Sequence, residues 1–164
     1  MRNIAKRHHA VCCFIIALTT FFPLLTTSID LITPTQFLGK DQTLVSAGQE
    51  FELGFFSSAR SNNWYIGIWY KNIEQRTIVW VANRDSPLRN SSGILKISPD
   101  DGNLLLVDEA GKSVWSSNHS SMAKNSVAEL LDNGNFVVHP EMIKTRKTTS
   151  GKALIIQPTH CCRV

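Results

Sequence analysis

The feature that most constrains the fold of this chain is an internal repeat. Trp-Val-Ala-Asn at 80–83 recurs thirty-five residues later as Trp-Ser-Ser-Asn at 115–118, and Asp-Gly-Asn-Leu at 101–104 recurs thirty-two residues later as Asn-Gly-Asn-Phe at 133–136. A weaker third copy begins at Gly48. In each copy a polar turn with glycine leads into an apolar run. A single hairpin cannot bury its own apolar face, so the repeat predicts about three sheets packed around a shared axis.

The apolar residues outside the N-terminus occur in short runs rich in Val, Ile, Phe and Trp, separated by Gly, Asn, Asp, Ser and Pro. Runs of this kind predict strands. No long stretch shows helical periodicity, which argues against βαβ architectures and favours short antiparallel strands in an all-β fold. The expected strands are 43–46, 51–56, 64–70, 77–82, 93–97, 104–107, 113–116, 128–131 and 136–138.

The N-terminus has the pattern of a secretory signal peptide. Three basic residues, Arg2, Lys6 and Arg7, precede an apolar run from 10 to 25, and small polar residues follow at 26–28. The alternative is a membrane anchor, but this run is interrupted by two threonines and a proline and is shorter than the ~20 residues that cross a bilayer. We therefore expect residues 1–28 to be removed, and the remaining chain to be secreted, to have no membrane span and to act outside the cell, in the apoplast.

Charge and cysteine content narrow the choice of partners. Residues 30–139 hold nine Lys or Arg against twelve Asp or Glu, so this part is mildly acidic and lacks the electrostatic basis for binding nucleic acid. Cys12 and Cys13 lie in the signal, and Cys161 and Cys162 lie at the other end of the chain. Adjacent cysteines have neither the spacing of a zinc site nor the geometry of a clasp, so we expect no metal and no cofactor.

Seven sequence blocks resemble the bulb-type (monocot mannose-binding type) lectin domain, in the form found in plant S-locus glycoproteins and S-domain receptor-like kinases. The resemblance covers residues 44–138 and implies a β-prism of three four-stranded sheets with pseudo-threefold symmetry, which we place at 29–139. The blocks are Leu-Val-Ser-Ala-Gly at 44–48, Phe-Glu-Leu-Gly-Phe-Phe at 51–56, Tyr-Ile-Gly-Ile-Trp-Tyr at 65–70, Val-Trp-Val-Ala-Asn-Arg-Asp at 79–85, Asp-Gly-Asn-Leu at 101–104, Val-Trp-Ser-Ser-Asn at 114–118 and Leu-Leu-Asp-Asn-Gly-Asn at 130–135.

The same resemblance implies where a sugar would bind. Mannose-binding members use Gln-x-Asp-x-Asn-x-Val-x-Tyr once per repeat, with polar groups for the sugar hydroxyls beside an apolar patch. No repeat of this chain keeps the glutamine or the tyrosine. The carbohydrate-binding candidates that remain are Asp101, Asn103, Asn133, Asn135 and Val137. Because several hydrogen bonds are lost, we expect mannose binding to be weak at most, and the two Asn-rich segments to serve as hairpin turns.

Aromatic residues admit two interpretations. Trp80 and Trp115 occupy equivalent positions inside apolar runs and are expected in the core. Trp64 and Trp69 lie in an aromatic strand, and the sequence leaves open whether they line a surface that faces a partner.

Two N-glycosylation sequons stand in turn-like segments, at Asn90 and Asn118. No Ser, His or Asp has the setting of a catalytic nucleophile, and no glycine loop is suited to phosphate. The sequence thus favours a secreted lectin-like recognition module, without catalytic residues, that meets glycans or a cell-surface protein. The alternative is a nonfunctional truncated product of an S-domain receptor-like kinase or S-locus glycoprotein gene.

Residues 140–164 depart from the resemblance. The spacing of Trp80 and Trp115 calls for a third tryptophan near residue 150, and none is present. One nucleotide stretch can encode residues 151–164 in one frame and a family-like Trp-Gln-Ser-Phe-Asp-Tyr-Pro segment in another. We therefore interpret this basic tail as aberrant and read in a shifted frame, and we expect the closing strand of the prism to be missing.

Overall fold

The computed structural model of the protein describes residues 28–29, 31–58, 61–120, 123–141 and 154–156, and every regular element within them is a β-strand. The all-β prediction is therefore confirmed. The strands are β1 (Ser28–Ile29), β2 (Leu31–Ile32), β3 (Phe37–Leu38), β4 (Thr43–Val45), β5 (Phe51–Ser57), β6 (Trp64–Tyr70), β7 (Ile78–Val81), β8 (Ile94–Ile97), β9 (Leu104–Val107), β10 (Ser113–Ser116), β11 (Ser126–Leu130), β12 (Phe136–Pro140) and β13 (Leu154–Ile156).

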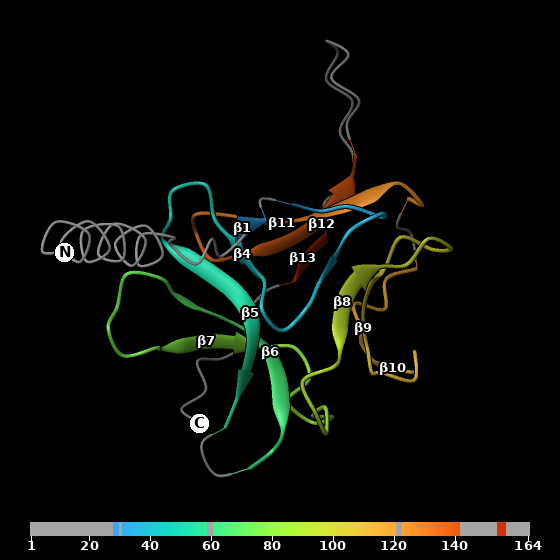
Figure 1. Ribbon diagram of the computed structural model, residues 1–164. Helices are drawn as coiled ribbons and strands as arrows, with labels where there is room; N and C mark the ends of the chain where they lie inside the picture. The colour runs from blue at the N-terminus through green and yellow to red at the C-terminus, as the bar shows by residue number, and fades with distance from the viewer. Residues whose placement is uncertain (1–27, 30, 59–60, 121–122, 142–153, 157–164) are drawn as a thin grey trace, which may run out of the picture.

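These strands form three sheets that lie around the centre of the molecule (Figure 1). Sheet A has the order β1-β4-β5-β6-β7, sheet B has the order β13-β12-β11-β2, and sheet C has the order β10-β9-β8-β3. All neighbours run antiparallel except β1, which pairs with β4 in parallel and makes sheet A five-stranded instead of four-stranded. The three sheets predicted from the repeat are thus present.

One face of each central hairpin supplies the core. In sheet A, Leu53 stands opposite Leu44 and Ile68. In sheet C, Leu95 pairs with Leu106, and all five of these leucine and isoleucine side chains are fully buried. Sheet B contributes Ala128, Val138 and Phe136, which are likewise inaccessible to solvent. Because side chains alternate along a strand, the residues between these core residues point away from the core. They form the outer faces of the sheets, which are accessible to a ligand.

A hydrogen bond between two turns joins sheets A and B. The Asp132 carboxylate accepts a hydrogen bond from the Gly48 backbone N–H at 2.6 Å. Gly134, in the same turn as Asp132, has φ of +81°, and a β-carbon there would lie 2.9 Å from the Phe51 ring. Glycine is required here both for the left-handed conformation and for the close approach of Phe51. The Asn-Gly turn of the third repeat therefore acts in tertiary packing as well as in reversing the chain.

The burial of the four tryptophans differs from what the sequence led us to expect. Trp80 and Trp115 pack edge to face with ring centroids 6.0 Å apart and contact the core, but they are half-buried and not enclosed. Trp64 also packs against the core from a half-buried position. Trp69 is buried, its indole N–H donates to Glu52 at 2.9 Å, and the Arg76 guanidinium lies over its ring. Trp69 is therefore not available as an aromatic contact for a partner.

The expectation that the closing strand is missing is wrong. Residues 154–156 form β13, which pairs with β12 in the register Phe136↔Ile156, Val137↔Ile155 and Val138↔Leu154. The outer edge of β12 offers unpaired backbone N–H and C=O groups, and a run of Leu-Ile-Ile has the β-propensity to pair with them. Strand pairing depends on backbone groups and does not require the tryptophan that the repeat spacing called for. The rest of the tail, 142–153 and 157–164, and residues 1–27 of the signal lie outside the described residues.

Candidate functional site

The turn before β9 uses the first pair of candidate residues to fix its own shape. The Asp101 carboxylate accepts a hydrogen bond from the Asn103 backbone N–H at 3.1 Å, which closes an Asx turn around Gly102. Hydrogen bonds from the Ser98 side chain, and then from Asn103, hold the pKa of Asp101 below its ordinary value. These bonds favour the charged form of the Asp101 carboxyl. Their contribution to stability is therefore fully present above the pKa that Asp101 has in the unfolded chain, and it is lost as the pH falls through the lower pKa that Asp101 has in the folded protein.

The Asn103 side chain, which is buried, clamps a neighbouring loop. Its Nδ2 donates to the His119 carbonyl at 3.1 Å, while its Oδ1 accepts from the His119 backbone N–H at 2.8 Å and from the Ser117 hydroxyl at 2.9 Å. Ser117 Oγ in turn accepts from the Leu104 N–H. In the family motif this amide would bind a sugar. In this protein its donor and its acceptor are both used by residues 117–119.

The turn before β12 holds the second pair. Asn133 is exposed, and its Oδ1 accepts a hydrogen bond from the Asn135 backbone N–H at 3.0 Å, which repeats the Asx turn of the first pair. Val137 is almost fully buried on β12 and stands opposite Glu129 of β11. The structure therefore brings Asn133, Asn135 and Val137 together in sheet B, but Asp101 and Asn103 belong to sheet C. The five candidates form two separate sites.

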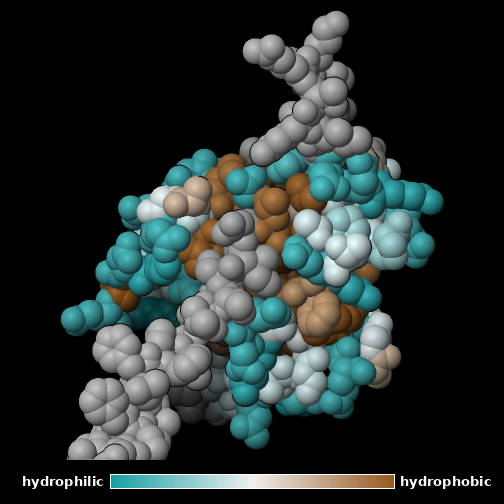
Figure 2. All heavy atoms as spheres, turned by 45° about the horizontal axis from the view of Figure 1, so that its top comes forward, coloured by the Kyte–Doolittle hydropathy of each residue, from teal (hydrophilic) through white to brown (hydrophobic). Residues whose placement is uncertain are grey.

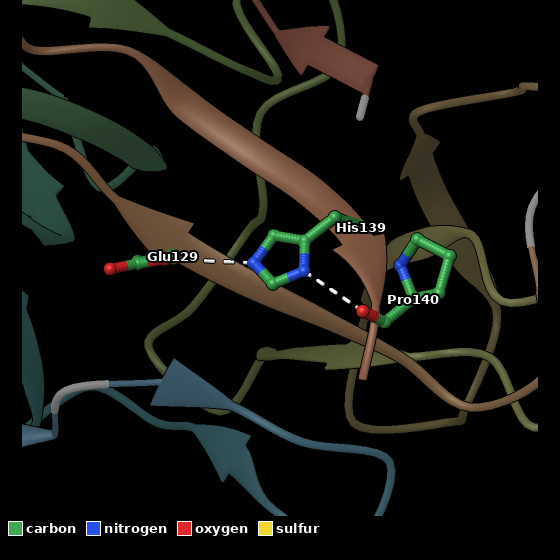
Figure 3. A network of polar contacts seen from close by, with 3 residues as sticks. All are labelled: Glu129, His139 and Pro140. Carbon is green, nitrogen blue, oxygen red and sulfur yellow. Dashed lines mark hydrogen bonds and ion pairs between the residues drawn. The ribbon is translucent and has the colours of Figure 1, made fainter. Parts of the chain in front are cut away.

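At the position that the motif reserves for tyrosine, β12 carries His139, whose ring faces Glu129 (Figure 3). His139 Nε2 lies 3.5 Å from Glu129 Oε2, and Nδ1 lies 3.0 Å from the Pro140 carbonyl oxygen. Glu129 was not among the residues that sequence reasoning selected. Only the pairing of Glu129 with Val137 across β11 and β12 reveals that it shares a face with the motif positions.

The matching outer face of sheet C lacks polar groups at the remaining motif positions. Leu105 and Val107 stand where the motif has valine and tyrosine, and Lys96 lies opposite Leu105. Phe37, paired with Lys96, is 53% exposed. A neutral sugar would find few convergent hydrogen-bonding groups on this face of sheet C. Figure 2 shows another side of the molecule, with the top of Figure 1 brought forward, where apolar side chains gather near the middle within a hydrophilic border.

The two glycosylation sequons lie in turns at the surface. Asn118 is exposed in a left-handed conformation with φ of +47°, in the loop that Asn103 clamps. Asn90 is half-buried, and its Oδ1 accepts from the Ser92 backbone N–H at 3.1 Å. Of the two, Asn118 offers its side-chain amide more openly to solvent.

The described part of the chain offers neither a metal centre nor a membrane-spanning helix. Among residues 28–29, 31–58, 61–120, 123–141 and 154–156, no three His, Cys, Asp or Glu side chains gather in a way that could hold a metal ion. The same part of the chain contains no helix with the length and apolar character to cross a membrane.

Known proteins similar to this chain include receptor-like kinases with a G-type lectin name, S-locus-specific glycoproteins and a mannose-specific agglutinin. Residues 77–154 match the model of the D-mannose binding lectin family. The chain is 46% identical over 146 residues to the G-type lectin S-receptor-like serine/threonine-protein kinase SRK of Arabidopsis thaliana, across 86% of this chain and 17% of the kinase. It is 53% identical over 103 residues to the S-locus-specific glycoprotein BS29-2 of Brassica oleracea var. alboglabra, across 62% of this chain and 23% of the glycoprotein.

The fold is similar to that of the mannose-specific agglutinin from snowdrop (Galanthus nivalis) bulbs, solved with methyl-α-D-mannoside. The TM-score is 0.54 at 17% identity, and the match covers 75% of this chain and 100% of the agglutinin. At this identity the likeness establishes a shared architecture. The sequence relatives are much longer, since the chain spans 17% of the length of the receptor kinase and 23% of that of the glycoprotein.

Proposed function

Because this chain carries a bulb-type lectin-like domain related to the S-locus glycoproteins and the S-domain receptor kinases, we propose that it acts as an extracellular recognition module without catalytic activity. The observation that carries the proposal is the contrast between an intact core and a diverted sugar motif. Three sheets enclose a continuous core, yet the Asn103 amide bonds residues 117–119. The domain therefore keeps the scaffold of a lectin, while the Asn103 amide, one of the motif groups that remain, serves the fold.

Its partner is a glycan of another class or a cell-surface protein. The mild acidity of residues 30–139 argues against a nucleic-acid partner. The S-domain relatives are receptors or glycoproteins by name, which fits a role in recognition.

We expect the secreted protein not to bind α-mannosides appreciably, with a Kd above about 1 mM in a calorimetric titration. The physical reason is that each motif copy lacks the glutamine and tyrosine, and that the remaining amide of sheet C is already hydrogen-bonded within the protein. The snowdrop agglutinin serves as the positive control in the same buffer. Micromolar affinity that is lost in Asp101→Ala or Asn135→Ala would contradict the prediction and restore the motif as a working site.

We also expect the full-length chain, expressed in plant cells, to reach the medium with its N-terminus near Ser28 and with a glycan on Asn118. N-terminal sequencing and the mass shift on enzymatic deglycosylation measure both results. An Asn118→Gln variant should lose one glycan, and Asn90→Gln tests the half-buried sequon in the same way. A retained Met1 would contradict the secretory assignment, and insoluble intracellular product would favour the alternative of a nonfunctional chain.

A further inference from the structure

The outer face of sheet A contains a small cleft whose lining includes none of the mannose-motif residues. It has a volume of about 240 Å³ and is lined by Phe56 of β5, Tyr65 of β6, Val81 of β7 and Arg84 just beyond β7. The volume is somewhat below the roughly 300 Å³ at which ordinary ligand pockets begin, so the cleft suits one small ring and not an extended ligand.

Strand register places these side chains on one face. Phe56 pairs with Tyr65, and two positions along, Gly54 pairs with Gly67, which in turn pairs with Val81. The core residues Phe55, Ile66 and Ile68 point the other way. Since side chains alternate, all the cleft residues on β5, β6 and β7 must face outward.

Gly67 forms part of the floor because it has no side chain. A β-carbon there would lie 2.7 Å from Cε1 of Phe56 and 2.8 Å from the Trp80 carbonyl oxygen, so the Phe56 ring lies down over Gly67. The Phe56 and Tyr65 rings stack with centroids 5.5 Å apart and an interplanar angle of 27°. The result is a rigid aromatic wall held by the sheet itself.

The chemistry of this lining selects for an anionic ring compound. An aromatic wall has a π-face against which the apolar C–H face of a sugar can pack. Arg84 adds a planar guanidinium, whose five N–H donors match a carboxylate in bidentate geometry and can serve more than one partner. The four lining residues include no carboxylate or amide side chain of the kind the mannose motif uses. A neutral sugar would take ordinary hydrogen bonds from Arg84 or Tyr65 but no charge-assisted pair, so the lining favours a ring that carries a carboxylate.

We propose that this cleft binds a hexuronate residue of an acidic saccharide, with the sugar ring against Phe56 and Tyr65 and the carboxylate on Arg84. The proposal deepens the recognition function proposed above and rests on it. It assigns recognition to the outer face of sheet A, whereas the mannose motif would have used the turns of sheets B and C.

A calorimetric titration of the secreted full chain with a short oligogalacturonide, and with the same oligomer fully methyl-esterified, tests the proposal. The acid form should bind, and the ester at least about tenfold more weakly, because the charge-assisted bond to Arg84 is lost. Arg84→Gln should weaken binding of the acid by about tenfold to a hundredfold and leave binding of the ester unchanged. The affinity of Arg84→Lys for the acid should lie between those of the parent protein and Arg84→Gln. Tyr65→Ala should weaken the binding of both the acid and the ester.

Arg89→Gln is the matched control, since Arg89 is exposed and does not line the cleft. Each variant is used only if its unfolding midpoint matches that of the parent protein. Equal binding of acid and ester, no binding of the acid to folded protein, or unchanged affinity in Arg84→Gln would each overturn the proposal. The recognition function proposed above would fail separately, if the chain gave only insoluble intracellular product and no folded secreted protein.

Discussion

Replacing Gly102 with alanine should destabilise the domain by roughly 3 kcal/mol or more, a large part of the ~5 to 15 kcal/mol that holds a typical domain folded. Gly102 has φ of +72°, which costs a residue with a β-carbon about 1 to 2 kcal/mol. The new β-carbon would also lie only 2.0 Å from the Ala123 carbonyl oxygen, so one of the two backbone segments has to move. Urea unfolding followed by tryptophan fluorescence measures the change as a shift in midpoint.

Gly111→Ala provides the matched control for this prediction. Gly111 has nearly the same conformation, with φ of +76°, but no atom lies within 4 Å of where its β-carbon would be. We expect this variant to lose only about 1 to 2 kcal/mol, the conformational part of the cost. Equal losses in the two variants would show that the turn before β9 does not press against the 123 region, and would contradict the packing described for it.

Replacing Asn103 with alanine should destabilise the domain by about 2 to 4 kcal/mol. The variant loses three hydrogen bonds to Ser117 and His119 and leaves the backbone groups of His119 without their partner. The cost of leaving these half-buried groups of His119 unpaired adds to the loss of the bonds themselves, so the expected effect is large for one side chain. The unfolding midpoint in urea measures the loss, and proteolysis within residues 117–119 should become faster.

The control for Asn103 is Asn135, which occupies the same motif position in the third repeat. Asn135 is half-buried, and we expect Asn135→Ala to change the stability by less than about 1 kcal/mol. Comparing the stability losses of the two variants shows whether the Asn103 amide stabilises the fold more than an asparagine at the same motif position does. If Asn103→Ala kept full stability and instead abolished a measured sugar affinity, then the amide would face a ligand and the proposed diversion of the motif would be wrong.

Much of the architecture is accessible from the sequence because its causes are local. Alternation of apolar and polar residues specifies strands, and Asn-Gly and Asp-Gly pairs specify the tight turns between them. The repeat of these features sets the number of sheets. Gly102 and Gly134 have the positive φ that such turns require. The same local reasoning explains why the mannose motif was found to be incomplete, since the missing glutamine and tyrosine are visible in the chain.

What the tertiary structure decided depends on contacts between distant segments. The Asn103 amide could have faced solvent, and only the docking of residues 117–119 commits it to the fold. Glu129 joins the motif face through its register with Val137, and the cleft at Arg84 exists because three strands align Phe56, Tyr65 and Val81. The β13 edge strand was not foreseen, since backbone pairing does not require a matching side chain. A sequence specifies periodicity and turns through interactions a few residues long, whereas the partner of each polar side chain is chosen by the packing of whole sheets.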